Sequence, residues 1–462
     1  MAIAIALASA ARAQPNSQPS ASTTQPTKAQ TTQWYRPSRA QSAGRTAEPV
    51  DYAHPLTVWD PAAPDWMLMG IEQRTRFEIF DDNYDNGVPR DEPFSLRSRA
   101  FLGVRELIDP LRFGFEFQDS RQFNATAPPE RNTVDENDIL QAYAELYFGE
   151  SLGLSQPLSF QFGRLANDYI DRRLRSRNGF RNTCNAFDGF RIRAGNRETP
   201  WELEFFAVQP VDIRTVQPNR SNEEQWFYGV VGAWRGFAPL AWIEPYYFIL
   251  DEDNKGWNAE DADLHTPGVH VYGDIGSSGF DYDLDVAFQY GNNLGLSQRA
   301  FATHAEIGYT FAHPWHPRVA FWVNYASGDR DPNDGIDNTF DRLFGSSNGH
   351  YGFLDYFIWS NMIQPSVQLS ASPTKSTRLN SIYRTVWLAS DTDAWARADR
   401  QDPTGQSGDF VGTEIDLFMH HDISQHLSIE IGYAHFFPGA FVRNTGDSPD
   451  SDRFYVQTIL RF

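Results

Sequence analysis

A two-residue alternation of apolar and polar side chains recurs along this chain from Leu68 to Phe462, and it restricts the fold more than any other feature. Between residues 111 and 118 the odd positions are all Leu or Phe, whereas the even positions are Arg, Gly, Glu and Gln. Successive side chains of a β-strand point to opposite faces of a sheet, so the pattern predicts strands with one apolar face. No run of about 18 apolar residues is present, which excludes a transmembrane helix.

Eighteen segments with this alternation can be placed along the sequence, and most are about ten residues long. That length suits a tilted strand that crosses a bilayer. The segments lie near residues 68–80, 94–107, 111–119, 138–149, 158–164, 186–194, 201–208, 226–235, 241–251, 266–275, 279–290, 300–312, 318–328, 362–372, 376–390, 408–422, 427–437 and 453–462.

The connections between these segments alternate between short and long. Short turns such as 108–110 and 276–278 follow every second segment, and the other connections are 81–93, 120–137, 165–185, 209–225, 252–265, 291–299, 329–361, 391–407 and 438–452. Outer-membrane barrels have this alternation of short periplasmic turns and long external loops, and soluble sandwiches have no reason for it. We therefore predict an all-β fold, a transmembrane antiparallel β-barrel of about eighteen strands over residues 68–462.

The two ends of the chain agree with export to an outer membrane. Residues 2–11 are small and apolar, and Ala11-Arg12-Ala13 resembles a cleavage site, so we expect a signal peptide at 1–13. Residues 14–67 are rich in Gln, Ser, Thr, Pro and Ala, which predicts a disordered periplasmic linker. The final strand closes on aromatic Phe462, as barrel-assembly signals do. We expect the barrel-assembly machinery, outer-membrane lipid and lipopolysaccharide as partners, in a Gram-negative-type bacterium.

Aromatic residues make up 15% of the chain although its mean hydropathy is −0.52. A membrane barrel combines these values, because apolar and polar faces average out and aromatic rings gather at both interfaces. The net charge of −21 argues against nucleic acid as a partner. The single cysteine excludes a disulfide framework.

The polar faces are expected to line a lumen, which in a ring of this size is a water channel or is plugged by loops. Arginines supply 36 of the 39 basic residues, and many lie on these faces or in the 165–185 loop. An inward-folded loop would form a basic constriction, whereas an external loop would bind lipopolysaccharide phosphates; arginines of the wall could instead brace it by pairing with carboxylates. The candidate pore-lining residues are Arg74, Arg76, Arg97, Arg99, Arg164, Arg173, Arg175, Arg177, Asp188, Arg191 and Arg193.

Other sites receive less support from the sequence. Tyr383, Arg384 and Trp387 are further pore candidates, and residues 329–335 have some features of a calcium loop but the wrong glycine position. No spacing of side chains demands catalysis, a metal ligand set or a phosphate loop. We predict no enzyme activity and no cofactor, with calcium in the external loops as a further hypothesis.

Several short motifs resemble the alginate export family of outer-membrane barrels. They are residues 74–78 (RTRFE), 96–100 (LRSRA), Gly163-Arg164 through 187–191 (FDGFR), 326–329 (ASGD), 339–344 (TFDRLF) and 351–355 (YGFLD). The resemblance covers roughly residues 68–462 and implies an eighteen-stranded barrel whose arginine-lined pore passes an anionic polysaccharide. It implies pore roles for Arg74, Arg76, Arg97, Arg99, Arg164, Asp188 and Arg191.

Three functions therefore remain open. The first is a conduit for an anionic polysaccharide or oligosaccharide through an arginine-rich lumen. The second is a general or carbohydrate-uptake porin without polymer specificity. The third is a structural or adhesive barrel whose acidic loops bind calcium.

Overall fold

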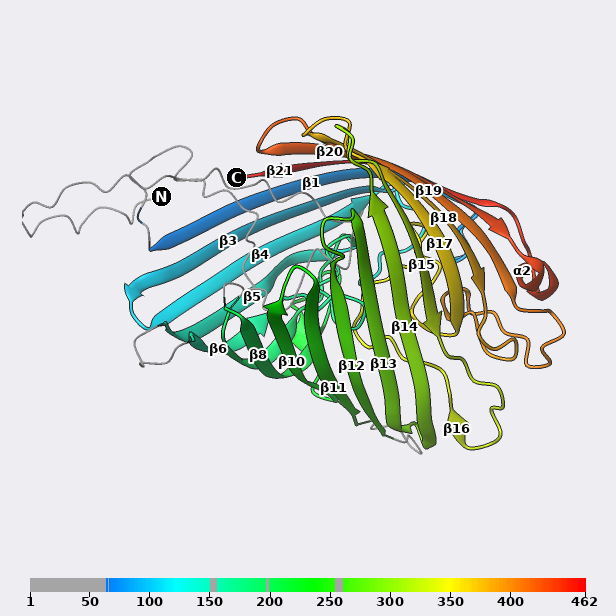
Figure 1. Cartoon of the computed structure of the whole chain (residues 1–462), viewed down its shortest axis with the longest axis horizontal. Helices are drawn as coiled ribbons and strands as arrows, with labels where there is room; N and C mark the ends of the chain where they lie inside the picture. Colours follow the sequence, from blue (N-terminus) through cyan, green and yellow to red (C-terminus); the bar gives the residue numbers. More distant parts are fainter. Residues whose placement is uncertain (1–63, 65, 150–155, 197–198, 254–260) are drawn as a thin grey trace, which may run out of the picture. The chain divides into compact units, whose positions relative to one another are not determined.

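The computed structural model describes residue 64 and residues 66–462, apart from 150–155, 197–198 and 254–260. The proposed signal peptide at 1–13 and most of the proposed linker at 14–67 lie outside the described residues, and both stay predictions. Within the described part, eighteen long antiparallel strands form a closed ring (Figure 1). The predicted fold class is confirmed.

Each long strand pairs with its neighbours in chain order. The long strands are β1 (Met67–Asp81), β3 (Phe94–Ile108), β4 (Leu111–Phe123), β5 (Asp135–Phe148), β6 (Leu158–Leu165), β7 (Phe187–Ala194), β8 (Trp201–Asp212), β10 (Gln225–Phe237), β11 (Ala241–Glu252), β12 (Ala262–Asp274), β13 (Phe280–Asn293), β14 (Leu296–Thr310), β15 (Arg318–Ala326), β17 (Met362–Ala371), β18 (Thr377–Trp387), β19 (Phe410–Asp422), β20 (Leu427–Pro438) and β21 (Ser451–Arg461). All eighteen predicted segments overlap one of them.

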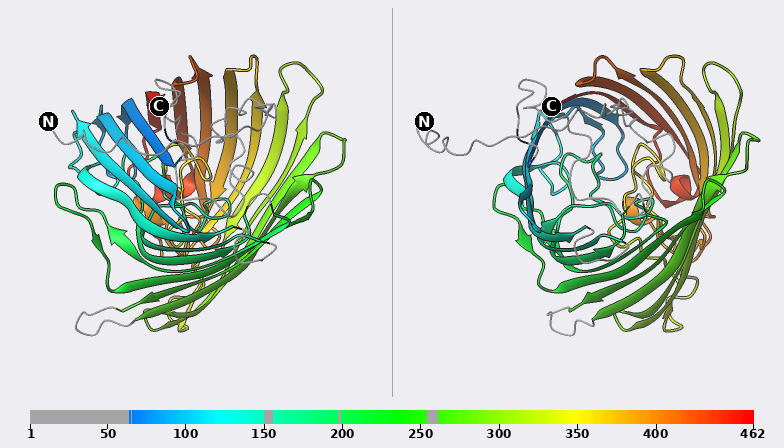
Figure 2. Two further views of the ribbon diagram at one scale, coloured as in Figure 1. Left: turned by 90° about the vertical axis from the view of Figure 1, so that its left-hand side faces the viewer. Right: turned by 60° about the vertical axis from the view of Figure 1, so that its left-hand side comes forward.

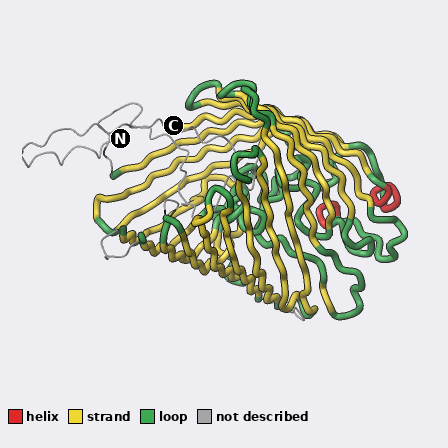
Figure 3. Tube along the Cα trace, in the orientation of Figure 1, coloured by secondary structure: helices red, strands yellow, loops and turns green. Residues whose placement is uncertain are grey.

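The remaining elements are short and lie in the connections. Two-residue strands occur at β2 (Arg90–Asp91), β9 (Arg220–Ser221) and β16 (Ile336–Asp337), and among the residues that the structure describes the helical segments are η2 (Ala396–Ala398) and α2 (Ala440–Thr445) (Figure 3). No helix in the described part of the chain is both long and apolar enough to cross a membrane.

The ring closes because the first long strand pairs with the last. Residues 72–81 of β1 lie in antiparallel register with residues 452–461 of β21. Two ion pairs cross this seam: Arg453 Nη2 lies 2.6 Å from Glu78 Oε1 in a buried pair, and the partly exposed Arg461 places its Nε 3.0 Å from Glu72 Oε2. Closure pairs the backbone N–H and C=O groups of β1 with those of β21. In lipid these groups would otherwise have no hydrogen-bond partner.

The connections alternate in length as predicted, with one exception. The long loop expected at 291–299 is absent, because β13 and β14 continue until only Leu294 and Gly295 separate them. Both residues have positive φ, 49° and 87°. Such values are typical of the two-residue turns that match the twist of a β-hairpin. The expected loop is therefore a tight turn between extended strands.

Alternation along each strand separates an apolar outer face from a polar inner face. On β1, Ile71 and Phe77 are exposed, whereas Glu72, Arg74 and Arg76 between and beside them are buried. Inner side chains are buried by their neighbours and by two connections that enter the ring, residues 166–186 and 327–361. Figure 2 shows loop traces of both sections, teal and yellow, inside the ring of strands. These two loops position the candidate site.

Candidate functional site

The 166–186 loop and the 327–361 loop are joined to each other inside the barrel. Ser176 N donates to Phe344 O at 3.1 Å, Phe344 N donates to Leu174 O at 3.0 Å, and Ser346 N donates to Arg172 O at 2.9 Å. The loops leave the barrel wall at different strands, so these backbone bonds make one crossbridge from two segments. The choice left open by the sequence is settled by these contacts: the 166–186 loop folds inward.

Three arginines of the wall hold the 166–186 loop by its backbone. Arg74 donates to the carbonyl oxygens of residues 179, 180 and 181 at 3.2, 2.9 and 2.7 Å. Arg76 Nη2 donates to the carbonyl of residue 180 at 2.5 Å, and Arg97 Nη1 donates to those of residues 179 and 181 at 2.8 and 3.0 Å. A guanidinium offers five donors in a fixed plane, which suits several carbonyls of one turn. These donors face the loop.

Other charges of the same wall pair with one another. Glu72 is fully buried, and its Oε1 accepts hydrogen bonds from Arg97 Nη2 at 2.9 Å and from Arg99 Nη2 at 2.6 Å. A buried carboxylate is tolerated when cations and hydrogen bonds surround it in this way. This arrangement supports the bracing interpretation for Arg97 and Arg99, whose contact with a solute stays a prediction.

The arginines of the 166–186 loop lie against three different parts of the barrel. Arg173 Nε lies 2.5 Å from Asp171 Oδ2, and its Nη1 donates to Asn324 of β15 at 3.2 Å. Arg177 Nη2 lies 3.4 Å from Glu116 Oε1 of β4. Arg175 sits among aromatic rings, with its Cζ between 4.1 and 4.5 Å from the ring centroids of Tyr169, Phe187 and Phe206.

Burial lowers the pKa of Arg175 to about 10, so its guanidinium stays charged near pH 7 and is attracted by the faces of the surrounding rings. This arginine therefore anchors the loop in the aromatic interior. Arg191 and Arg193 occupy alternate inner positions of β7, where Arg191 Nη1 lies 3.7 Å from Glu204 Oε2. They are placed in the lumen as predicted from the alternation, but their role with a solute is untested.

Arg164 and Asp188 correct the sequence prediction. They are Cα partners on β6 and β7 and alternate with inner residues, so they share the outer face with Phe162 and Phe190. Arg164 holds Asp188 through two bonds of 2.8 and 2.9 Å, and Ser221 Oγ donates to the same carboxylate at 2.6 Å. The pair ties the 213–224 connection to the rim and does not line the lumen.

A second group of arginines gathers around Arg181 and was only partly recognised from the sequence. Arg131, Arg342 and Arg397 come from three other long loops, and each of them acts electrostatically on Arg181. Burial lowers the pKa of Arg181 to about 10 against the opposing effect of Asp355, and burial together with Arg397 also lowers the pKa of Arg342. Arg397 Nη2 pairs with Asp355 at 3.3 Å and with Asp85 at 3.4 Å. Asp341 also acts on Arg342, and Glu130 acts on Asp85, so the four arginines lie among four carboxylates.

Charge is unevenly distributed around the inner wall. The inner faces of the neighbouring strands β21, β1, β3 and β4 carry the glutamates Glu72, Glu78 and Glu116 and the arginines Arg74, Arg76, Arg97, Arg99, Arg105, Arg112, Arg453 and Arg461. Half way round the ring, strands β11 to β15 carry one inner arginine, Arg318, and the acids Glu244, Asp281, Asp283, Asp285 and Glu306. One wall is therefore basic, and the facing wall is acidic.

The wall between them contains a site that only the fold brings together. Of the weaker candidates, Tyr383 is exposed on the outer face, and Trp387 packs on Phe410, whereas Arg384 is inner and fully buried. Arg384 Nη2 lies 3.0 Å from Asp416 Oδ2 of β19. Glu414, two residues earlier, accepts from the backbone of residues 353 and 354 at 2.6 and 3.3 Å and so fixes the 327–361 loop to the wall.

His350 of the 327–361 loop faces the same region. Burial holds the pKa of its imidazole well below the ordinary value of 6.5, and Arg173, Arg172, His304 and Arg384 act in the same direction. The ring is therefore neutral near pH 7. No periodicity marks His350 in the sequence, because its position depends on how the loop folds inside the ring.

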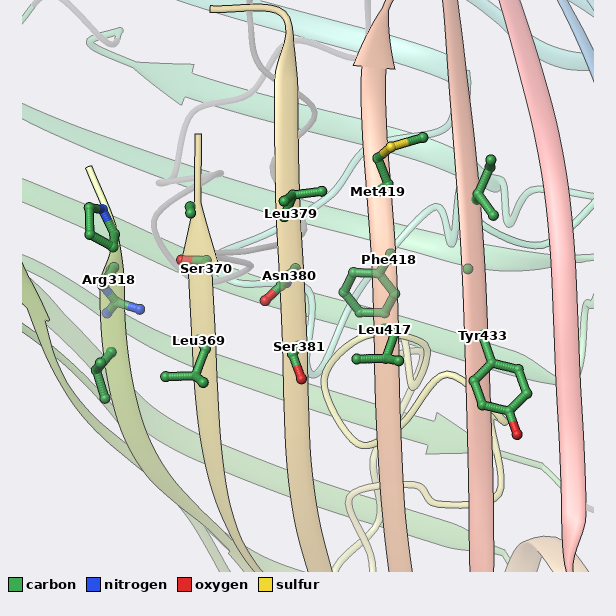
Figure 4. Close-up of a pocket in the computed structure, with 15 residues that line it drawn as sticks. Arg318, Leu369, Ser370, Leu379, Asn380, Ser381, Leu417, Phe418, Met419 and Tyr433 are labelled. Carbon is green, nitrogen blue, oxygen red and sulfur yellow. The ribbon is translucent and has the colours of Figure 1, made fainter. Parts of the chain in front are cut away.

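A shallow groove of about 660 Å³ lies over strands β15 and β17 to β20, and Figure 4 shows Leu369, Leu379, Leu417 and Tyr433 along it. These four side chains belong to the exposed, apolar face of the barrel. The groove is consistent with contact to acyl chains and is separate from the lumen. Among the residues that the structure describes, no group of three or more His, Cys, Asp or Glu side chains is arranged to hold a metal ion.

Known structures share this fold at low sequence identity. OccK11 (OpdR) of Pseudomonas aeruginosa is 11% identical, with a TM-score of 0.58 and coverage of 86% of this chain and 96% of that one. OpdK of the same organism, solved with vanillate, is 10% identical, with a TM-score of 0.60 and coverage of 85% and 99%. OccAB2 of Acinetobacter baumannii is 12% identical, with a TM-score of 0.58 and coverage of 85% and 98%. No curated protein matches the sequence.

A family model described as alginate export matches residues 65–456. The match covers nearly the whole described barrel, and with the porin-like fold it assigns the chain to the channels of the outer membrane of Gram-negative bacteria. The chain therefore belongs to the alginate export family of outer-membrane β-barrels.

Proposed function

We propose that this channel passes an anionic polysaccharide or oligosaccharide through the lumen. The observation that carries the proposal is the basic wall formed by the inner faces of β21, β1, β3 and β4, beside which Arg131, Arg181, Arg342 and Arg397 supply further guanidinium groups. These four arginines lie among the carboxylates of Asp85, Asp341, Asp355 and Glu130, so they offer guanidinium donors without a net positive charge of their own. Guanidinium groups bind carboxylates in a planar, bidentate manner, so this cluster suits the acidic groups of a uronate chain.

The charges of the basic wall are unequal in number. Strands β21, β1, β3 and β4 bring eight inner arginines against three glutamates, and this excess favours anions along that side. Many of these arginines hold the 166–186 loop or pair with glutamates, so their effect on a solute is through their field. Membership of the alginate export family agrees with an acidic polymer as the solute.

The second candidate is a general or carbohydrate-uptake porin, and a specific observation keeps it open. The fold neighbour OpdK was solved with vanillate, a small aromatic carboxylate. The joined 166–186 and 327–361 loops narrow the lumen, which suits small solutes as well as an extended chain. The polyanion channel predicts block by an acidic oligosaccharide and not by a neutral one, whereas the general porin predicts no such preference, so the charge and the size of the blocking solute separate the two candidates.

Single-channel recording in planar bilayers tests the proposal. Block should be measured with a uronate oligosaccharide, a neutral oligosaccharide of equal length, and vanillate. The test variant is Arg181→Gln with Arg342→Gln, and the matched control is Arg330→Gln, an exposed arginine of the 327–361 loop. Loss of one charge-assisted contact of about 1.4 kcal/mol should weaken uronate block about tenfold in the double variant and leave the control unchanged.

Each outcome decides between the candidates. Block by the uronate oligomer but not by its neutral counterpart supports the polyanion channel. Equal block by both sugars, or block by vanillate alone, refutes it and favours the uptake porin. Cation selectivity of the wild-type channel would also refute it.

A further inference from the structure

Three polar side chains form a row across the inner faces of β14, β15 and β17. His304 and Asn324 are Cα partners, and so are Asn324 and Gln364. All three side chains are buried. Asn324 Oδ1 accepts a hydrogen bond from His304 Nδ1 at 2.7 Å, and Asn324 Nδ2 donates to Gln364 Oε1 at 2.9 Å. The row is therefore one hydrogen-bonded unit that crosses three strands.

The central amide of this row also bonds both loops that enter the ring. Arg173 Nη1 of the 166–186 loop donates to Asn324 Oδ1 at 3.2 Å. Asn324 Nδ2 donates to the carbonyl oxygen of His350, in the 327–361 loop, at 3.4 Å. With the two bonds inside the row, these contacts use both lone pairs of the oxygen and both hydrogens of the nitrogen. Asn324 therefore has its full set of hydrogen bonds, and half of them go to the loops.

The two loops contact each other at the same place. Arg173 Cζ lies 5.5 Å from the ring centroid of Tyr351 and 5.6 Å from that of Trp359, which is within the range of a cation–π attraction. Gln364 Nε2 donates to the carbonyl oxygen of Tyr351 at 2.7 Å and so adds a second bond from the row. Arg173, Tyr351 and Trp359 are at most 2% exposed. The junction of the loops is therefore packed against the wall.

Other inner side chains make a different kind of contact. Gln289 Nε2 of β13 donates to Asp341 O at 2.7 Å, and Gln289 Oε1 accepts from Asp341 N at 2.8 Å. Arg74 donates to the 166–186 loop, as described above. Within the part of the chain that the structure describes, the bonds of Gln289 and Arg74 reach a single loop each. Asn324 differs because one side chain fixes the position of both loops.

We infer that Asn324 is the positioning residue that holds the two loops together on the wall, so that they move as one body. The position of both loops inside the ring sets how much of the lumen is free for ions. Release of this amide therefore lets the loops move separately, and the channel switches more often between conductance levels. The inference goes beyond the proposed solute, because it concerns the loops and not what passes them.

Hydrogen exchange of backbone amides, measured by mass spectrometry on the folded barrel, tests the inference. Asn324→Leu keeps the shape of the side chain and removes all four hydrogen bonds. The matched control is Gln289→Met, which removes a similarly buried inner amide that bonds the 327–361 loop. Each variant is checked for a folded barrel by heat-modifiable gel mobility.

We expect exchange in Asn324→Leu to rise about tenfold in both loops, at residues 170–178 and 345–352, which corresponds to about 1.4 kcal/mol. In Gln289→Met the rise should be confined to the 327–361 loop. Asn324→Asp separates the two contacts, because it keeps an oxygen that accepts from Arg173 and loses the donor to the carbonyl of His350. Its exchange should rise at residues 345–352 and stay at the wild-type rate at residues 170–178. This variant decides where Asn324→Leu does not fold.

Single-channel recording in potassium chloride gives the functional readout. Transitions between conductance levels should become about tenfold more frequent in Asn324→Leu. They should be unchanged in Asn380→Leu, which removes a buried inner amide of β18 whose side-chain atoms have no hydrogen-bond partner among the described residues. Wild-type exchange in either loop of Asn324→Leu, or a wild-type transition rate, would overturn the inference, as would equal loosening of both loops in Gln289→Met. Failure of uronate block would refute the proposed solute and leave this result standing.

Discussion

Removing the donors of Arg74 should release the 166–186 loop from the wall. This side chain donates four hydrogen bonds to the loop, to three carbonyl oxygens and to Asn182 Oδ1, at 2.7 to 3.2 Å. Arg74→Met keeps a long side chain and removes every donor. Arg76 and Arg97 still hold the same turn, so we expect a shifted equilibrium rather than a misfolded barrel.

The size of the shift can be worked from the contacts. A hydrogen bond to a charged group contributes about 1.5–3 kcal/mol. Water reaches the freed carbonyls once the loop moves, so two of the four bonds are a reasonable measure of the loss, or about 3 kcal/mol in total. Since about 1.4 kcal/mol is a factor of ten, the open fraction of the loop should rise about 100-fold.

Limited proteolysis with trypsin measures this fraction, because the loop carries cleavage sites at Arg172, Arg177 and Arg181 among others. When the loop closes faster than it is cut, the cleavage rate follows the open population. The matched control is Arg318→Met, an equally buried inner arginine that pairs with Asp281 and Glu306 and not with the loop. A wild-type cleavage rate in Arg74→Met would refute the role of the Arg74 hydrogen bonds in holding the 166–186 loop. Equal acceleration of cleavage in both variants would indicate that the whole barrel is destabilised.

Three further predictions follow from the described contacts. Arg164→Ala should lower the stability of the rim by about 1 kcal/mol, which is measured as faster amide exchange in residues 213–224. The conductance should not change, because Arg164 and Asp188 lie outside the lumen. A lower conductance would show that Arg164 lines the pore. Leu417→Arg puts a charge at the middle of the outer face and should lower the free energy of unfolding in lipid vesicles by about 2–4 kcal/mol, whereas a wild-type value would argue against membrane contact there. The neutral His350 ring binds a proton more readily when the 327–361 loop is released, so stability falls below pH 6.5, at most by about 1.4 kcal/mol for each pH unit. Hydrogen exchange of amides 340–359, corrected for intrinsic rates, should accelerate between pH 7 and pH 5. If the acceleration persists in His350→Phe, a group other than His350 causes the pH dependence.

The strands could be predicted because the alternation of apolar and polar residues shows which side chains of a barrel strand face outward and which face inward. In 111–118 the alternation of Leu or Phe with polar residues alone gives strand, faces and approximate ends. The turn at Leu294-Gly295 was missed since leucine rarely adopts positive φ, and the polar residues around it read as a loop. The same alternation places Arg164 with Phe160 and Phe162, and a strict reading of it would have put this arginine outside.

The candidate site could be predicted only in part. Periodicity identified Arg74, Arg76 and Arg97 as inner residues, but not that their donors face a loop about one hundred residues away in sequence. The contacts of His350 and Glu414 depend on the path of the 327–361 loop inside the ring, and a loop has no period from which to read its contacts. Sequence patterns therefore predict the strands of the barrel wall, whereas the positions of the loops inside the barrel depend on tertiary contacts.

The seam between β1 and β21 has a consequence for how this protein reaches its native state. Its ion pairs join residues 375 and 389 positions apart, so the ring cannot close until the last strand has been made and exported. Until then β1 and β21 each have one edge of unpaired backbone groups, so the unclosed chain is prone to aggregate. Such distant contacts make folding slow, which gives periplasmic chaperones and the insertion machinery time to act before closure. A truncation of even the last few residues should therefore stop assembly of the whole barrel rather than shorten one strand.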